Sequence, residues 1–267
     1  MFLGGPAKAM TPALHTPVNS ASLLKGIVLA GGSGTRLRPA TLRTNKHLLP
    51  VHGRPMILYA IDTLVGSGIQ DIAVVVGHEH VAAFREILGD GRHLGAPGLQ
   101  LLAQDAPRGV AHALSLAREF AAGARSCVLL ADNLIEHPVA EEAAAFMRQP
   151  SGARFLLTQA EDPHRHGVAT VVDGTLTGIV EKPSRSHSRL VVVGLYFYDH
   201  TVFDACASLA PSSRGELEIT DVNNTYIARG DASFSMVRGW WMDVGTPESL
   251  AAASQLLAET ARTRGNP

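Results

Sequence analysis

The sequence predicts an α/β fold in which a mostly parallel central sheet carries helices on both faces and a smaller mixed or antiparallel section is added. In the first half of the chain, short apolar runs alternate with helical patterns, and such alternation produces right-handed crossovers between parallel strands. From about Arg154 the apolar runs follow one another closely, which is typical of antiparallel or mixed pairing. A chain of 267 residues, 46% of them hydrophobic, can bury one large core of this kind or two small ones.

The elements can be assigned in order along the chain. In the first half, apolar runs predict strands over 26–30, 71–77, 99–104 and 126–132, and helical patterns fall between them over 54–68, 79–91 and 109–123. In the second half, strand-like runs cover 154–160, 167–174, 175–183 and 189–199, and helices return over 216–230 and 247–261. Residues 1–23 lack the long apolar core of a signal peptide. We expect them to form a flexible extension and residues 24–267 to form a single domain.

Charge and composition argue against several classes of partner. The 23 Lys and Arg residues are balanced by 24 Asp and Glu residues, so no overall basic field is available to hold nucleic acid. No apolar stretch reaches the roughly 20 residues that a membrane-spanning helix needs. The two cysteines, Cys127 and Cys206, show no metal-binding spacing, and Cys127 lies in an apolar run where a buried reduced thiol is expected. We therefore expect a cytoplasmic protein without nucleic-acid or membrane partners.

A glycine-rich turn follows the first strand in the stretch "GIVLAGGSGTRLRP". Backbone N–H groups at the end of a strand, flanked by glycines, allow an anion such as phosphate to approach closely. The P-loop pattern is absent because no Lys-Ser or Lys-Thr pair follows, and a dinucleotide fingerprint would need glycine at Leu37. A phosphate-binding turn and a plain glycine turn with surface arginines both remain open from this stretch alone.

Acidic residues close two of the predicted strands and follow the apolar run "GWWM", at the sheet edge where ligands of open α/β folds bind. Asp132 closes the run "SCVLLAD", Glu181 and Lys182 close "TLTGIVEKP", and Asp243 follows "GWWM". Two carboxylates directed at a bound phosphate would form a magnesium site. Alternatively, Asp243 could cap the helix that begins near Pro247, because aspartate is a common N-cap residue.

Longer motifs resemble one enzyme family. The stretch "GIVLAGGSGTRLRPATLRTNKHLLPVHGRPMI" is similar to the opening of the bacterial sugar-1-phosphate nucleotidyltransferases, and looks most like short-form glucose-1-phosphate thymidylyltransferases. The likeness continues through "LAQDAPRGVAHAL", "LLADN", "GIVEKP", "VVGLYFYD", "GELEITDVNNTYI" and "WWMDVGT", from about Lys25 to Leu257. It implies a Rossmann-like nucleotidyltransferase fold and magnesium (Mg2+) dependence. The implied reaction transfers a nucleotidyl group from dTTP or UTP to a sugar 1-phosphate with release of pyrophosphate.

The resemblance also implies residues for the nucleotide, within a nucleotide-binding part of about 24–150. These are Leu29, Gly31, Gly32, Gly34, Thr35, Arg36, Gln104, Pro107, Gly109 and Asp132. Arg36 and Lys46 would hold the triphosphate, where fixed cations stabilise the charge that develops on a leaving pyrophosphate. The amide of Gln104 would contact the base, because an amide that both donates and accepts matches the edge of thymine or uracil.

A sugar-phosphate-binding part of about 151–267 is implied for the acceptor. The residues that the resemblance assigns to the sugar phosphate are Asn133, Gly167, Glu181, Lys182, Val192, Tyr196 and Trp241. Lys182 would bind the phosphate and Glu181 a sugar hydroxyl, while Asp132 and Asp243 would hold Mg2+. Arg36, Lys46, Asp132, Lys182 and Asp243 form the implied catalytic set. The acceptor phosphate is already anionic near neutral pH, so catalysis reduces to alignment and charge neutralisation.

Some positions depart from the family pattern and leave alternatives open. Ala131 stands where relatives carry glycine, and His166 stands where they tend to carry an aromatic residue. These positions border the implied sugar pocket, so an amino, deoxy or cyclitol phosphate could replace glucose 1-phosphate. A cytidylyltransferase acting on a phosphonate or other phosphorylated acceptor, and a catalytically inactive nucleotide-sensing subunit, are the alternative functions. Retention of the five implied catalytic residues argues against the inactive subunit. A homodimer is also left open.

Overall fold

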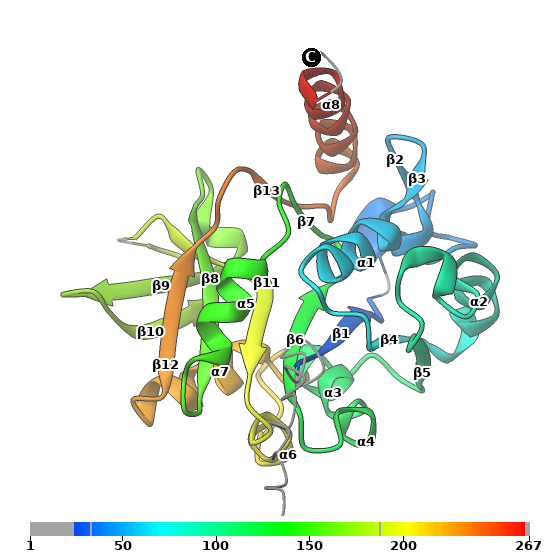
Figure 1. Ribbon diagram of the computed structural model, residues 1–267. Helices are drawn as coiled ribbons and strands as arrows, with labels where there is room; N and C mark the ends of the chain where they lie inside the picture. Colours follow the sequence, from blue (N-terminus) through cyan, green and yellow to red (C-terminus); the bar gives the residue numbers. More distant parts are fainter. Residues whose placement is uncertain (1–23, 33, 187, 265–267) are drawn as a thin grey trace, which may run out of the picture.

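The computed structural model describes residues 24–32, 34–186 and 188–264 (Figure 1). The flexible extension predicted for residues 1–23 lies outside the described residues. Within the described part, nine strands form the main sheet. They are β1 (Leu24–Ala30), β4 (Ile72–Gly77), β5 (Gln100–Gln104), β6 (Arg125–Leu130), β8 (Ala153–Gln159), β9 (Gly167–Val172), β10 (Thr175–Glu181), β11 (Leu190–Tyr198) and β12 (Ala232–Met236).

The first half of the chain builds a parallel region in the order β5-β4-β1-β6. β1 lies between β4 and β6, with Val28 beside Val74 on one side and Leu129 on the other. All three side chains are fully buried. Continuous apolar runs of this kind belong to strands covered on both faces, and the prediction of parallel strands in this half is confirmed.

The second half adds strands through β11, which pairs antiparallel with β6. β11 also pairs antiparallel with β8 and β9, and its register against β8 shifts between Val192 and Tyr196. β10 extends the sheet beyond β9, and β12 lies parallel to β8. The predicted mixed section is therefore present, and it continues the same sheet (Figure 1).

Helices cover both faces of the sheet. They are α1 (Met56–Gly66), α2 (Val81–Leu88) and α5 (Ala140–Met147) on one face, and α3 (Val110–Ser115), α4 (Arg118–Ala121), α6 (Val202–Ala207) and α7 (Ile219–Ala228) on the other. Successive residues of β1 divide between the two cores: Ile27 packs with the α3 side, and Val28 packs with the α1 side. This alternation follows from the period of two in a strand. The predicted fold class is confirmed.

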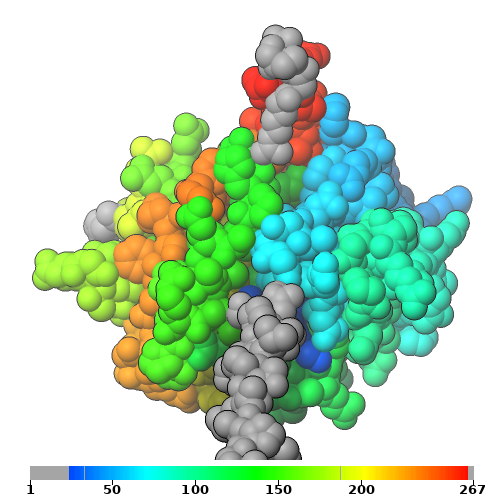
Figure 2. Space-filling view, in the orientation of Figure 1, coloured from blue at the N-terminus to red at the C-terminus, as the bar shows by residue number. Residues whose placement is uncertain are grey.

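Small elements join the two halves at the top of the view in Figure 1. They are β2 (Pro50–Val51), β3 (Arg54–Pro55), β7 (Asn133–Ile135), β13 (Trp241–Asp243) and α8 (Pro247–Arg264). β7 and β13 pair antiparallel, with Asp243 opposite Asn133. A small apolar cluster that includes Val51, Leu134 and Ala253 lies beneath α8. Figure 2 shows α8, in red, projecting beyond the first-half elements (blue to teal) and the second-half elements (green to orange).

Several elements differ from the predictions. The helix expected over 109–123 is divided into α3 and α4, and the helix expected over 216–230 begins only at Ile219. The elements α5, α6, β12 and the β7–β13 pair were not predicted. Short 3-10 helices cover Thr35–Leu37, Lys46–Leu48, His78–His80, Arg92–Leu94 and Pro163–Arg165. In the described ranges, no helix combines the length and apolarity needed to cross a membrane.

Candidate active site

The glycine turn after β1 is shaped by side chains that cross it. Gly34 has a φ of 61°, in the left-handed region that favours glycine, and a Cβ there would lie 2.9 Å from Lys46 Cβ. A Cβ on Gly32 would lie 3.1 Å from Lys46 Cε. A Cβ on Gly31 would collide with Gln104 Oε1. The missing side chains therefore allow Lys46 and Gln104 to lie against the turn.

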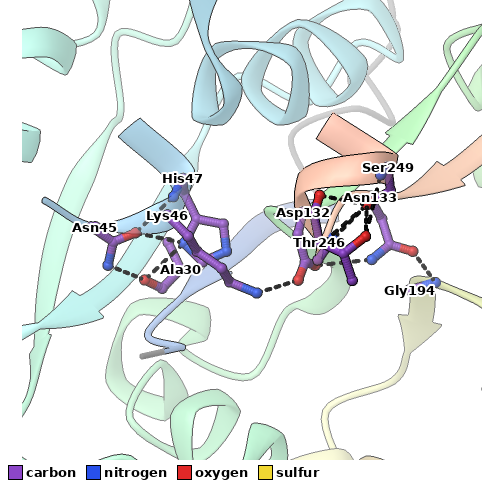
Figure 3. Close-up of polar contacts among 10 residues, drawn as sticks. Ala30, Asn45, Lys46, His47, Asp132, Asn133, Gly194, Thr246 and Ser249 are labelled. Atoms are coloured by element: carbon purple, nitrogen blue, oxygen red, sulfur yellow. Dashed lines mark hydrogen bonds and ion pairs between the residues drawn. The ribbon is translucent and has the colours of Figure 1, made fainter. Parts of the chain in front are cut away.

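The segment that carries Lys46 is fastened to the end of β1 (Figure 3). Asn45 Nδ2 donates to the Ala30 carbonyl at 3.1 Å. His47 Nδ1 lies 3.1 Å from the same carbonyl and 2.8 Å from Asn45 Oδ1. Burial, reinforced by the Lys46 charge, lowers the pKa of His47 to about 3. His47 is therefore neutral and serves as a fixed donor that holds Lys46 beside the turn.

A cavity of about 330 Å³ opens over this turn. Its walls include Lys46 and all ten residues assigned to the nucleotide: Leu29, Gly31, Gly32, Gly34, Thr35, Arg36, Gln104, Pro107, Gly109 and Asp132. Six lining residues were not predicted: His47, Val110, Ala113, Leu130, Glu216 and Gly245. Glu216 and Gly245 come from the second half of the chain, and the motifs "GELEITD" and "DVGT" were the signals that could have indicated them.

Asp132 is paired with Lys46 at the end of β6. Lys46 Nζ forms an ion pair with Asp132 Oδ2, and Asn133 Nδ2 donates to Asp132 Oδ1 at 3.0 Å (Figure 3). Both members of the ion pair are largely buried, with 13% and 15% of their side chains exposed. Burial alone would raise the pKa of Asp132, but the adjacent Lys46 charge and these hydrogen bonds hold it below its usual range. Asp132 is thus a carboxylate at neutral pH.

Asn133 positions its neighbours on three sides. Its Oδ1 accepts from the Gly194 backbone N–H at 2.9 Å and from Trp241 Nε1 at 2.7 Å, while its Nδ2 reaches Asp132. A Cβ on Gly194 would lie 2.6 Å from the Asn133 amide carbon, so glycine is needed there for this close approach. Asn133 is 5% exposed. Its amide therefore links β11, β13 and the Asp132 carboxylate.

Asp243 approaches Asp132 through the pairing of β13 with β7. The Val244 N–H donates to the Asp132 carbonyl at 2.8 Å, and Asp243 lies opposite Asn133. Burial, and then repulsion from Asp132, raises the pKa of Asp243 to about 6. The charged form of Asp243 is therefore destabilised, both by burial and by the neighbouring Asp132 carboxylate.

The alternative in which Asp243 caps a helix is wrong. Thr246 immediately precedes α8, and its Oγ1 accepts from the Ser249 N–H at 3.2 Å. Ser249 Oγ accepts in return from the Thr246 N–H at 3.1 Å. This reciprocal arrangement satisfies the first turn of the helix, and Asp243 remains in β13 with its carboxylate on a cavity wall.

The two carboxylates have donor chemistry that fits a magnesium ion. Mg2+ is commonly bound by one or two carboxylates, with phosphate and water as the other ligands. Within the described ranges, no three or more His, Cys, Asp or Glu residues gather as a metal cluster, and a two-carboxylate site does not require one. The Lys46 ammonium now occupies Asp132 Oδ2, which indicates that a cation is favoured at this point.

A second cavity, of about 200 Å³, adjoins the first. Its walls include Asp243 and all seven residues assigned to the sugar phosphate: Asn133, Gly167, Glu181, Lys182, Val192, Tyr196 and Trp241. Glu181 at the end of β10 lies opposite Gly167 at the start of β9. Glu181 accepts from Thr220 Oγ1 at 2.7 Å and lies 3.0 Å from Lys182 Nζ. The contacts leave Lys182 half-exposed at the cavity rim.

Lys182 is held by its backbone as well as by its charge. Its φ is 42°, in the left-handed region, and its N–H donates to the His166 carbonyl at 3.0 Å. The His166 ring meets Trp241 edge-on, with ring centroids 5.1 Å apart. Burial lowers the pKa of His166, so an uncharged imidazole lines the cavity.

Several lining residues of this cavity were not predicted, and Arg214 and Asn223 are among them. Arg214 Nη2 lies 2.8 Å from Glu218 and 3.7 Å from Glu181. Asn223 is 1% exposed, and its Oδ1 accepts from the buried Tyr198 hydroxyl, so its amide has a fixed orientation on the cavity wall. Arg214 directly precedes the motif "GELEITDVN" and Asn223 is its last residue, so both were available signals.

The two cavities share a border. Five residues line both: Arg36, Val110, Leu130, Asp132 and Glu216. The Arg36 guanidinium lies against Gly245, since a Cβ there would be 3.0 Å from Arg36 Nη2. A basic group and a carboxylate therefore stand where a ligand in one cavity would meet a ligand in the other. This arrangement can bring two anionic groups together and neutralise their charges.

Comparisons with known proteins agree with this geometry. The sequence profile described as nucleotidyl transferase matches residues 25–260. A glucose-1-phosphate thymidylyltransferase of Xanthomonas campestris is 41% identical over 244 residues, covering 90% of this chain and 82% of that protein. A glucose-1-phosphate thymidylyltransferase of Mycolicibacterium smegmatis is 39% identical, covering 88% of this chain and 82% of that protein.

Solved structures of nucleotidyltransferases also match this chain. A candidate glucose-1-phosphate thymidylyltransferase from Bacillus anthracis matches with a TM-score of 0.84 and 42% identity, covering 87% of this chain and 94% of that chain. A UDP-glucose pyrophosphorylase matches with a TM-score of 0.77, covering 89% of this chain and 99% of that chain; at 23% identity this shows the fold alone. The family resemblance inferred from the motifs is confirmed: the chain belongs to the nucleotidyl transferase family.

Proposed function

We propose that this protein transfers a nucleotidyl group from dTTP or UTP to a sugar 1-phosphate and releases pyrophosphate. The observation that carries the proposal is the pair of adjoining cavities that share Arg36 and Asp132. A glycine turn with Lys46 lines one cavity, and Lys182 lines the other. Relatives about 40% identical are named glucose-1-phosphate thymidylyltransferases, which supports the same reaction class.

In this reaction, an oxygen of the sugar phosphate forms a bond to the α-phosphorus of the triphosphate. The bond between the α-phosphorus and the oxygen that bridges to the β-phosphate breaks, and pyrophosphate leaves with the electron pair. Arg36 and Lys46 are the groups we assign to the leaving pyrophosphate, because both line the first cavity. Fixed cations at that place favour the transition state, in which the negative charge on the leaving group has grown.

On the acceptor side, we assign Lys182 and Arg214 to the sugar phosphate and Glu181 to a sugar hydroxyl. Glu181 lies beside Lys182 and Arg214. The acceptor phosphate would replace Glu181 as the anionic partner of these two cations. The phosphate oxygen is anionic near neutral pH and requires no general base. Alignment and charge neutralisation are then the contributions of these residues.

We assign Mg2+ to Asp132 and Asp243. Burial and then repulsion between the two partly buried carboxylates raise the pKa of Asp243, which supports this assignment because a cation relieves the repulsion. When bound, the ion supplies positive charge that stabilises the phosphates in the transition state. Asn133 donates to Asp132 Oδ1 and thereby orients the carboxylate.

Base choice is assigned to Gln104. The residue is 3% exposed and lines the first cavity, where an amide can pair with the imide edge of thymine or uracil. This favours dTTP or UTP over CTP and argues against the cytidylyltransferase alternative. The identity of the sugar is left open, because His166, a departure from the family pattern, lines the second cavity together with Trp241. Amino and deoxy sugar phosphates therefore belong in the test.

We retain the division into a nucleotide-binding part of about 24–150 and a sugar-phosphate-binding part of about 151–267 as a proposal. Most residues of the first cavity come from the earlier range and most of the second from the later one, which supports it. The free and buried thiols of Cys127 and Cys206 support a cytoplasmic location. A homodimer remains a proposal that sedimentation analysis would test.

The decisive experiment measures pyrophosphate release. The purified protein is incubated with Mg2+, each nucleoside triphosphate in turn, and a panel of sugar 1-phosphates, and the nucleotide sugar is identified by mass spectrometry. We expect release only when dTTP or UTP and a sugar 1-phosphate are both present. Turnover with CTP and a phosphonate would support the cytidylyltransferase instead. Nucleotide binding without any turnover would support the inactive subunit.

A further inference from the structure

We propose that His112 is a positioning residue that selects the base: its ring Nδ1 accepts a hydrogen bond from Gln104 and turns the Gln104 amide so that it pairs with an imide. The inference rests on the proposed function, since it assigns Gln104 to the base. His112 is the third residue of α3, and Gln104 is the last residue of β5. In this proposal His112 acts through Gln104 and does not itself contact the substrate.

The contact between the two side chains is specific. Gln104 Nε2 lies 2.9 Å from His112 Nδ1. Gln104 is 3% exposed, so its amide is confined between α3 and the glycine turn. The opposite atom, Gln104 Oε1, lies against Gly31, and no hydrogen-bond partner for it occurs among the described residues. The amide therefore directs its carbonyl oxygen at the cavity with a vacant acceptor.

The orientation of this amide decides which base it can read. Gln104 Nε2 carries two hydrogens, of which one is used by His112. The other hydrogen and Oε1 share one edge of the amide, and this edge presents a donor beside an acceptor. Thymine and uracil offer the complementary pair, an imide N–H beside a carbonyl oxygen. Cytosine reverses the pair, so it would require the amide to turn over.

Turning the amide over conflicts with a His112 ring whose Nδ1 is unprotonated. The carbonyl oxygen of Gln104 would then face the lone pair of Nδ1, and two acceptors would stand opposite each other. His112 is half-buried, and burial together with the nearby Arg108 lowers its pKa, against an opposing effect of Asp105. The ring is thus uncharged near neutral pH, which keeps Nδ1 available as an acceptor provided that the proton resides on Nε2.

The test compares base preference in three variants whose substituted residues, His112 and Ser115, line neither cavity. His112→Leu removes the acceptor at similar volume, and His112→Asn restores an acceptor oxygen near the position of Nδ1. Ser115→Ala is the matched control, because Ser115 Oγ donates to the His112 carbonyl and not to its ring. The measurement is kcat/KM for dTTP, UTP and CTP with one sugar 1-phosphate, with melting temperatures as a check of folding.

We expect His112→Leu to lower the ratio of dTTP to CTP turnover by about ten-fold, as loss of one orienting hydrogen bond would. The change should fall on KM, with kcat for dTTP nearly unchanged, and both His112→Asn and Ser115→Ala should keep the wild-type ratio. An unchanged ratio in His112→Leu overturns this inference and leaves the proposed function intact. A wild-type enzyme that uses dTTP, UTP and CTP equally, or none of them, overturns the inference together with the assignment of Gln104.

A second measurement on the wild-type protein does not depend on activity or on a variant. Long-range nitrogen-15 spectra of the free protein report which ring nitrogen of each histidine carries the proton. We expect His112 to carry it on Nε2 at pH 7.5, with Nδ1 unprotonated. A proton on Nδ1 would mean that the ring donates to Gln104, and this result overturns the inference.

Discussion

The two acidic residues assigned to one cation have opposite environments. Asp132 is stabilised as a carboxylate by Lys46 and Asn133, whereas the pKa of Asp243 is raised to about 6 by burial and by Asp132. An acid whose pKa is raised on folding destabilises the folded protein once the pH exceeds the folded pKa, and it costs nothing below the unfolded pKa. The charge of Asp243 therefore costs stability at neutral pH and not near pH 3.8, its ordinary pKa.

From this difference we predict that Asp243→Asn stabilises the metal-free protein. The gain should be on the order of 1–2 kcal/mol at pH 7.5 and should shrink as the pH falls from 6 towards 4, because Asp243 is protonated there. Asp132→Asn should destabilise the protein instead, since it leaves Lys46 without its partner. Urea unfolding of both variants between pH 4 and pH 8 measures these effects. Equal shifts for the two variants would contradict the assigned environments.

The substitutions Asp132→Asn and Asp243→Asn should both reduce activity, although they should change stability in opposite directions. Both substitutions remove negative charge that would balance a bound Mg2+, so each should reduce turnover by several orders of magnitude. The double variant should be little worse than either single variant, because groups that act as a unit are not additive. Pyrophosphate release with and without Mg2+ provides the measurement. A fully active Asp243→Asn protein would defeat the shared-cation assignment.

A substitution of Lys182 should affect binding of one substrate and not of the other. Its ammonium lies at the second cavity, 3.0 Å from Glu181, and it does not line the first. We predict that Lys182→Ala raises Kd for the sugar 1-phosphate by at least about ten-fold through loss of a charged contact, while Kd for dTTP changes by less than about two-fold. Calorimetric titration with each ligand tests this, with Lys25→Ala as a control distant from the cavities. A folded variant that no longer binds dTTP would place the lysine on the other substrate.

Particular residues show how far sequence reasoning reached at this scale. The motifs indicated which side chains face the cavities, because a motif preserves chemistry and spacing. They gave no indication that Asn133 would bind Gly194, Trp241 and Asp132 together, nor that Tyr198 would orient Asn223. Apart from the bond between the adjacent residues Asn133 and Asp132, those contacts join residues between 25 and 108 positions apart, and such pairings depend on tertiary structure.

At the scale of elements, a single glycine connects the two halves of the site. Gly109 has a φ of 103°, and a Cβ there would lie 2.5 Å from the Leu217 carbonyl oxygen. The segments around Gly109 and Leu217 are joined by backbone hydrogen bonds, Leu217 N–H to the Arg108 carbonyl and Ala111 N–H to the Leu217 carbonyl, at 2.9 and 3.1 Å. The loop that begins α3 is thereby attached to the segment that precedes α7.

We therefore predict that Gly109→Ala destabilises the protein by more than about 3 kcal/mol, because it combines backbone strain with a collision. Gly230→Ala is the matched control: its φ is 75°, but a Cβ there meets nothing within 4 Å. The control should cost only about 1 kcal/mol. Thermal and urea unfolding of the two variants provide the comparison. Similar losses would mean that strain, and not the contact with Leu217, determines the effect.

The sequence predicted those helices and strands whose own residues show a hydrophobic pattern. Each strand of the parallel half contains an apolar run, so the positions of these strands were confirmed. β12, with the sequence "ASFSM", lies at a sheet edge and is only partly buried, so it has no apolar run to indicate it. β7 and β13 have three residues each, and they pair because the chain brings them together.

At the scale of the whole molecule, the proposed cation site spans both halves of the chain. Asp132 follows β6 of the parallel region, Asp243 ends β13 near the C-terminal helix, and Lys46 extends from the segment after the glycine turn. In the free protein, Lys46 supplies the positive charge at Asp132. A cation that binds both carboxylates must therefore displace an ammonium group that is already in contact with one of them.

This competition makes a prediction about metal binding without substrates. Lys46→Met keeps most of the side-chain stem and removes the charge, so Asp132 and Asp243 are left as two close, unbalanced carboxylates. We expect millimolar Mg2+ to raise the melting temperature of Lys46→Met by several degrees more than that of the wild type, since a ligand that binds the folded state stabilises it. Arg54→Met, which breaks an exposed ion pair with Asp62 at 2.9 Å, is the matched control and should respond like the wild type. Removal of the ion with a chelator should reverse the shift. If Mg2+ affects Lys46→Met and the wild type equally, then Lys46 does not compete for Asp132, and the carboxylate pair is not where the cation binds.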